Sequence, residues 1–181
     1  RSIAIQGSDA SQSDDTRQVL SNRINGMIEQ SVSLLNSTYL GKSIFSGTDT
    51  DNLTPFTYDG SAVTYSGNEG SMNRRISEGL DIKVNVTGGE IAGSGVFDAL
   101  VELRDALAAD DPALVATLMD TLENAGENVL ELESQNGLSR AHMEMTETRL
   151  ETAKTNMLSF LSDAEDADLA ETIMQYNGAE M

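Results

Sequence analysis

The chain has 181 residues, with 11 lysines and arginines against 30 aspartates and glutamates, which gives a formal net charge of −19. Such a charge excludes nucleic acids and anionic membrane surfaces as partners, because both require a basic face. Cysteine and tryptophan are absent, so disulfides and thiolate sites are excluded. Alanine, leucine and methionine supply most of the apolar content, which favours packing of helix on helix.

A first helix is predicted over about residues 11–40, after a small, polar lead-in that we expect to be frayed. Either Ser11 or Ser13 can cap its start. Asp14 and Asp15 follow in the first turn, where carboxylates face the positive end of the helix dipole.

The body of this helix carries an apolar seam. Its residues recur at alternating spacings of four and three, which is typical of a helix packed along a partner: Leu20, Ile24, Met27, Ser31, Leu34 and Thr38, widened by Ile28 and Leu35. We expect the seam to pack against the C-terminal helix, mainly at its Leu150, Met157 and Phe160.

Residues 42–92 are rich in glycine and differ from the rest of the chain. The segments 56–58 and 63–65 flank Asp59-Gly60, a strong signal for a hairpin, although its connection can exceed two residues. Further along, four apolar residues alternate with polar ones, as in a half-buried strand: Leu80, Ile82, Val84 and Val86. The range therefore predicts a small β-hairpin subdomain of two or three strands.

Helices return after this insertion. A short helix is predicted over about 95–109, and Pro112 suits the first turn of the next one. Two regular apolar frames follow, on either side of Gly137, and they begin at Val115 and Met143. These two residues are separated by four whole heptads, so the frames are in phase, and we expect one long helix over about 112–176, at most bent near the glycine.

These elements predict a mainly α protein with a small β part. We expect an elongated antiparallel helical bundle or rod, with long coiled-coil-like helices and an inserted β-hairpin subdomain. Helices of such length cannot bury their seams in a compact ball, which is the reason for the elongated form.

Candidate chemical groups are few, and each favours a structural interpretation. His142 has no nucleophile or carboxylate motif to support catalysis. Residues 49–52 resemble the start of a calcium loop but lack its glycine and closing glutamate. A cluster of carboxylates near the end is typical of a solvated helix face: Asp163, Glu165, Asp166 and Asp168. We therefore predict no catalytic, cofactor-binding or metal residues and no cofactor, in a protein that is not an enzyme.

Several motifs resemble those of a known family. The stretch 36–51, NSTYLGKSIFSGTDTD, followed by Pro55-Phe56 and Tyr58-Asp59-Gly60, is similar to the passage from helix to β structure in flagellar hook-associated proteins of the FlgL type, which are flagellin-like. This chain has Lys42-Ser43 where the family has Arg-Tyr. Further similar segments follow in the family's order: 75–79, 84–88, 96–100, 136–140 and 165–171.

The resemblance implies a non-enzymatic, secreted part of the bacterial flagellum that serves motility. Proteins of this type join the hook, through a second hook-associated protein, to the flagellin filament. It also implies export through the flagellar type III apparatus to an extracellular location, self-assembly into a ring when full length, and an export chaperone as a candidate partner. The whole range 1–181 would then be one flagellin D1-like rod domain, and we expect terminal helices beyond both ends of this sequence.

Two other functions stay open. The chain can be a flagellin, the filament subunit of the same family, or a coiled-coil sensor or adhesin whose β insertion carries a binding pocket. We also expect this chain to be monomeric in solution, because its apolar seams are expected to be buried within the subunit and its charge opposes association.

Overall fold

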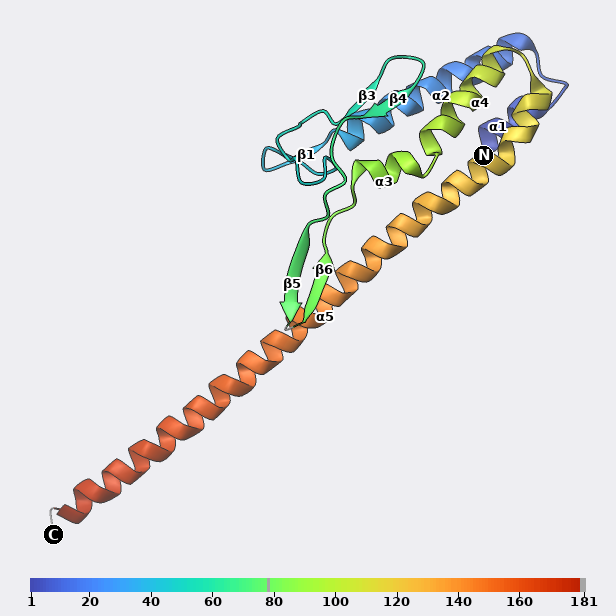
Figure 1. The fold of residues 1–181 in the computed structure, drawn as a ribbon. Coiled ribbons are helices and arrows are strands. Elements are labelled where there is room, and N and C mark those ends of the chain that lie inside the picture. Colours follow the sequence, from blue (N-terminus) through green and yellow to red (C-terminus); the bar gives the residue numbers. More distant parts are fainter. Residues whose placement is uncertain (78, 180–181) are drawn as a thin grey trace. The chain divides into compact units, whose positions relative to one another are not determined.

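A computed structural model describes the backbone of residues 1–77 and 79–179, and their side chains except those of 166–173, 175 and 177–179. The chain divides into two compact units, Arg1–Ser139 and Arg140–Met181. Helices make up most of the described residues and the strands form small antiparallel pairs, so the mainly α class with a small β part is confirmed (Figure 1). No helix in the described ranges is both long and apolar enough to span a bilayer.

The first unit begins with two helices, α1 (Ser2–Ser8) and α2 (Asp14–Leu35). Helix α1 occupies the segment that was expected to be frayed, because Ile3 and Ala4 are buried in the core. Ser13 caps α2 by accepting a hydrogen bond from the Thr16 amide, as its sequence predicts.

Helix α2 ends at Leu35, before the predicted limit near residue 40. The side chain of Asn36 stops it by pairing with the backbone of Phe56, accepting from its amide at 3.0 Å and donating to its carbonyl oxygen at 2.8 Å. Beyond it, Leu40 and Gly41 have φ angles of 51° and 76°, which a helix cannot contain.

The buried face of α2 differs from the predicted seam. Four apolar residues spaced four apart are buried: Leu20, Ile24, Ile28 and Val32. Met27 and Leu34 of the predicted seam are exposed. Residues spaced four apart form a stripe that winds slowly around a straight helix. Such a stripe suits a neighbouring helix that crosses α2 at an angle.

That neighbour is helix α4 (Val96–Ala108), which makes the largest contact of α2. To the shared core α4 contributes Phe97, Leu103 and Leu107. The β part adds Phe56, and the start of the last helix adds Val115 and Leu118. Leu20 and Ile24, which were predicted to face Leu150, Met157 and Phe160, therefore pack in the core of the first unit instead. Periodicity identifies an apolar face but not the helix that covers it.

In the described part of the chain, the β structure consists of three separate two-stranded antiparallel pairs. They are β1 (Thr38–Tyr39) with β2 (Lys42–Ser43), β3 (Phe56–Tyr58) with β4 (Val63–Tyr65), and β5 (Asn73–Ser77) with β6 (Leu80–Lys83). In the second pair Phe56 lies opposite Tyr65, and four residues, 59–62, connect the strands. Ile82 is buried, but Leu80 is exposed and residues 83–86 are all partly buried, so the predicted alternation over Val84 and Val86 is not found.

Short connections join the remaining helices. Thr87 and Glu90 form a capping box at the start of α3 (Gly88–Gly93), inside the range predicted as β. Helix α5 (Pro112–Ala179) begins with Pro112, and Asp111 accepts a hydrogen bond of 2.9 Å from the Leu114 amide. It continues through Gly137 without a break, as the phase of the two frames predicts.

Candidate functional site

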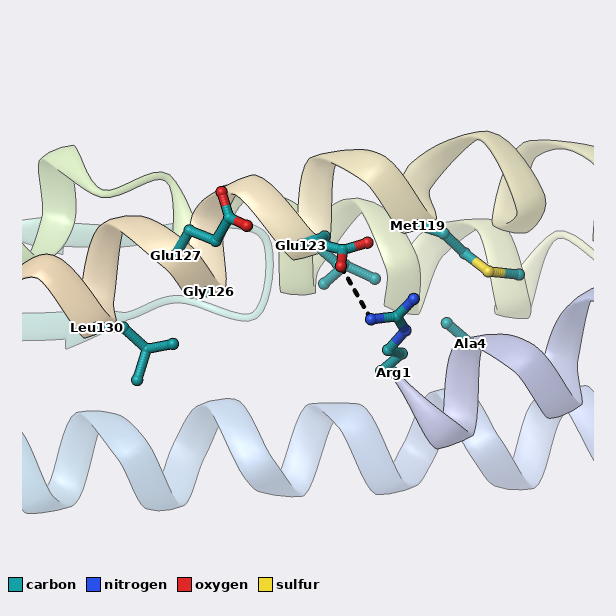
Figure 2. Close-up of a pocket in the computed structure, with 8 residues that line it drawn as sticks. Arg1, Ala4, Met119, Glu123, Gly126, Glu127 and Leu130 are labelled. Carbon is teal, nitrogen blue, oxygen red and sulfur yellow. Dashed lines mark hydrogen bonds and ion pairs between the residues drawn. The ribbon is translucent and has the colours of Figure 1, made fainter.

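The first unit contains an apolar hollow between α1 and α5, with a volume of about 500 Å³. It is lined by Arg1, Ala4, Met119, Leu122, Glu123, Gly126, Glu127 and Leu130. Figure 2 shows Arg1 and Glu123 facing each other across it, with Ala4 and Met119 near one end and Leu130 toward the other. The hollow exists because Ala4 and Gly126 are too small to fill the space between the two helices.

The chemistry of this hollow suits packing rather than catalysis. Arg1 Nη1 lies 2.9 Å from Glu123 Oε1, and both side chains are largely exposed, so the pair contributes little to stability. Its other lining groups are mainly apolar, and a nucleophile with a base does not occur among them. A hollow with this lining can accommodate an apolar side chain of a neighbouring segment.

A polar network attaches the β3–β4 hairpin to the helices. Tyr58 Oη donates to Asn25 Oδ1 of α2 at 2.6 Å, and Arg104 of α4 donates to Tyr58 Oη and to the Gly60 carbonyl oxygen, the latter at 2.6 Å. Burial acts to lower the pKa of Arg104, but its bonds to Asp105 and Tyr58 outweigh it and raise that pKa. The guanidinium therefore stays charged and holds three elements together.

A second arginine, Arg17, is buried and joins the ends of the helices. The side chain of Arg17 is 6% exposed; its Nε bonds to Asp110 Oδ1, and its Nη1 donates to the Asp9 carbonyl oxygen at 3.2 Å. Asp110 has a φ of 54°, so the turn between α4 and α5 is fixed where this arginine reaches it. Arg17 thus ties the α1–α2 turn to the α4–α5 turn, which is a structural role.

A further hollow of about 400 Å³ lies beside the loop 37–54. Its lining mixes apolar side chains with amide and hydroxyl groups: Tyr39, Lys42, Ser43, Ile44, Phe45, Thr50, Met72, Val84, Asn85, Val86 and Asn136. The Ser43 hydroxyl is buried and has no hydrogen-bond partner. A binding module in the β insertion would require a hollow of this kind.

The residues considered for catalysis or metal binding do not come together. His142 is exposed on α5, and Asp163 and Glu165 are exposed on the same helix, whereas the side chains of Asp166 and Asp168 lie outside the described residues. In the loop 49–52, Asp51 pairs with Lys42 rather than pointing toward an ion site. Among the described residues, no three acidic, histidine or cysteine side chains gather as metal ligands would.

The networks around Arg17 and Arg104 were not predicted. A signal for Arg17 exists, because it lies three residues before Leu20 and so falls on the buried face of α2. Arg104 has a similar signal within α4, because it lies three residues before the buried Leu107. A single arginine on an apolar face indicates a buried ion pair or a hydrogen-bonded cation.

Comparison with known proteins gives matches in fold. No family model and no curated protein sequence matches the chain. FlgL of Xanthomonas campestris matches with a TM-score of 0.73 and 15% identity, over 90% of this chain and 87% of that one. FlgL of Bacillus cereus matches with a TM-score of 0.61 and 20% identity, over 87% and 75%.

A third solved structure, assigned to a flagellar hook-associated protein of Vibrio parahaemolyticus, matches with a TM-score of 0.71 and 20% identity. That match covers 85% of this chain and 72% of the other. The chain therefore has the fold of FlgL-type flagellar hook-associated proteins.

Proposed function

We propose that this chain is a structural, non-enzymatic part of the bacterial flagellum, a hook-associated junction protein between the hook and the flagellin filament. One observation carries the proposal: three solved structures of flagellar hook-associated proteins share its fold over 85–90% of its length. The motifs around Asn36–Asp51 support the same family independently of the fold.

The proposal includes partners and a location. A second hook-associated protein binds on the hook side and flagellin on the filament side, and the full-length protein assembles into a ring. The chain reaches the outside of the cell through the flagellar type III apparatus, with an export chaperone as a candidate partner, and residues 1–181 act as one flagellin D1-like domain. The lack of cysteine is compatible with export of an unfolded chain, since no disulfide has to form.

The contacts within the first unit fit a mechanical role. Arg17 and Arg104 each hold several elements with charged hydrogen bonds, which are stronger than neutral ones. Elements fixed in this way keep their orientation under load, as a subunit that transmits torque requires.

Immunogold labelling tests the proposal. An antibody raised against this chain is applied to flagella isolated with hook and filament attached. The expected result is gold at a single position between hook and filament, and a strain without the gene provides the control for specificity. Gold along the entire filament would instead identify the chain as flagellin, and labelling elsewhere on the cell would reject the flagellar role.

The hollow beside loop 37–54 favours a second candidate, a sensor or adhesin binding module. Its volume of about 400 Å³ lies in the range of small-molecule sites, and its unpaired Ser43 hydroxyl can bind a polar ligand. A thermal-shift screen with sugars, amino acids and organic acids tests this. A ligand that raises the melting temperature of the wild type and not of Ser43→Val supports a binding module.

A further inference from the structure

The hairpin of β1 and β2 ends in a two-residue turn that consists of Leu40 and Gly41. Their φ angles are 51° and 76°, so both residues are left-handed, as in a type I′ turn. Asparagine, aspartate and glycine are preferred at the first of these positions, because a left-handed backbone brings the Cβ atom of other residues close to the following carbonyl oxygen. Leu40 therefore strains the turn that it occupies.

The side chain of Leu40 does not offset this strain by packing within the described part of the chain. It is 86% exposed, the highest value among the large apolar side chains of the described residues, and its neighbour Tyr39 is 71% exposed. A leucine that is both strained and exposed makes the folded chain less stable than an asparagine would. Strain of this kind is typical of positions that contact another molecule.

The turn is held in place by its neighbours. The Ser43 amide donates to the Thr50 carbonyl oxygen at 2.9 Å, and Lys42 Nζ donates to Asp51 Oδ1 at 2.5 Å. Both bonds attach strand β2 to the loop that follows it. The two apolar side chains are therefore presented by a pre-organised turn, which reduces the entropy that is lost on binding.

Charge also distinguishes this part of the chain. Residues 30–48 contain no aspartate or glutamate and one basic residue, Lys42, although the whole chain has 30 acidic residues among 181. The bond to Asp51 uses one of the three hydrogens of the Lys42 ammonium group, so it can also donate to a carboxylate of a partner. The tip of the hairpin thus combines exposed apolar groups with a cation, and it does not repel an acidic surface.

We propose that this hairpin tip, defined by Tyr39, Leu40 and Lys42, binds an acidic face of a second copy of this chain. A second copy fits because all 30 carboxylate side chains of the chain lie outside residues 30–48, so its other surfaces offer the negative charge that the tip lacks. Contact between two tips would place two surfaces without carboxylates together and gain little attraction. The contact therefore joins unlike surfaces, as in assemblies that close into rings or continue as filaments.

The inference does not depend on the flagellar assignment, because it uses only residues of this hairpin and the charge of the chain. The expectation of a monomer considered the helix seams and the total charge of −19, and the hairpin tip lies outside those seams. Two apolar side chains make a small contact, whereas stable interfaces bury about 1,200–2,000 Å² in total. We therefore expect weak association that is visible only at high concentration.

Leu40→Asn gives the sharpest test, because it should affect stability and association in opposite directions. Asparagine suits the left-handed position, so the melting temperature at low micromolar concentration should rise by about 2–4 °C. Sedimentation equilibrium between about 5 and 500 µM should show association of the wild type that Leu40→Asn weakens at least tenfold. A melting temperature that falls would show that the chain itself covers Leu40, and this result overturns the proposal.

Leu80→Asn is the matched control. Leu80 is 46% exposed beside the turn of the β5–β6 hairpin, which lies apart from β1 (Figure 1). This variant should change the association less than twofold. Far-UV circular dichroism checks that both variants keep their helix content. A wild type that stays monomeric at the highest concentration, or equal association of the wild type and Leu40→Asn, overturns the proposal.

Cross-linking identifies the face that the tip binds. The photoreactive variant Leu40→p-benzoylphenylalanine keeps an apolar side chain in the turn. Unlabelled and isotope-labelled chains of this variant are mixed, irradiated and digested, and peptide pairs of mixed isotope content report contact between copies. We expect such pairs to join position 40 to residues outside 30–48. Pairs that join two tips, or cross-links found only within one copy, overturn the proposal.

Discussion

The hydroxyl of Tyr58 donates a hydrogen bond of 2.6 Å to Oδ1 of Asn25, and this bond joins the β3–β4 hairpin to helix α2. The amide nitrogen of Asn25 donates to Glu29 at 2.8 Å, which fixes the orientation in which Asn25 accepts. Arg104 donates to the same tyrosine oxygen. Tyr58 is therefore both donor and acceptor in a contact between residues far apart in the sequence.

Tyr58→Phe tests this network. The variant keeps the ring but leaves Asn25 and the charged Arg104 without their shared partner, so we expect a loss of about 1–3 kcal/mol in the free energy of unfolding. Urea denaturation measures it. Tyr39→Phe is the control, because Tyr39 is 71% exposed, and its effect should stay within about 0.5 kcal/mol.

Leu103 in the first unit and Leu150 in the second differ strongly in their exposed fraction. Leu103 is 1% exposed and Leu150 is 58% exposed. Leu103→Ala should lower the free energy of unfolding of the first unit by about 2–5 kcal/mol, since it removes buried methyl groups and leaves a cavity. Leu150→Ala should cost less than about 1 kcal/mol at low micromolar concentration.

Denaturation of both variants, followed by circular dichroism at the same protein concentration, decides between the two positions. Equal losses for the two leucines would show that a neighbouring segment covers Leu150 at low concentration.

Sequence patterns predicted the helix boundaries better than the helix partners. The Ser13 cap, Pro112 and the unbroken heptad phase depend on local geometry, which neighbouring residues determine. The partner of α2 depends on contacts between distant segments. An apolar face at Leu20 and Ile24 is equally compatible with α4 and with α5, so periodicity alone could not distinguish them.

Some missed features had local signals. Thr87 and Glu90 have the spacing of a capping box and mark helix α3, which the glycine-rich composition of the range 42–92 obscured. Helix α1 had no such signal, because no side chain caps it and its burial of Ile3 and Ala4 depends on packing in the core. The hollow between α1 and α5 could not be predicted for the same reason.

Gly47 occupies a position that a side chain cannot share with Asn68. A Cβ atom at residue 47 would lie 2.1 Å from the Asn68 carbonyl oxygen, and the φ of Gly47 is +71°. Gly47→Ala should therefore cost about 2–4 kcal/mol, from backbone strain and from the displacement of Asn68.

Gly41→Ala separates the two causes. Gly41 has a nearly equal φ of +76°, but nothing lies within 4 Å of a Cβ atom there. Its variant should lose only the strain, about 1 kcal/mol. The difference between the two variants, measured by urea denaturation, gives the cost of the steric clash, and equal losses would contradict a close approach of Asn68.

Asp59 predicts a dependence of stability on pH. Its carboxylate accepts hydrogen bonds from the Ala62 amide at 2.8 Å, the Ser61 hydroxyl at 2.7 Å and the Ser61 amide at 2.8 Å. These bonds, that from the Ala62 amide first, lower the pKa of Asp59 from 3.8 to about 2. Hydrogen bonds to the ionised form favour it, which explains the direction.

The sign of the effect follows from this lowered pKa. The folded chain binds the Asp59 proton less readily than the unfolded chain does, so the contribution to stability is present above pH 3.8 and is lost as pH falls through about 2. Asp59→Asn keeps an oxygen acceptor but cannot titrate. The wild type should melt at a higher temperature than this variant at pH 6, and the difference should shrink between pH 4 and pH 2. Other carboxylates titrate in both proteins, so the difference isolates Asp59, and a difference that grows on acidification would show that Asp59 is not bound as the ionised acceptor in the 59–62 turn.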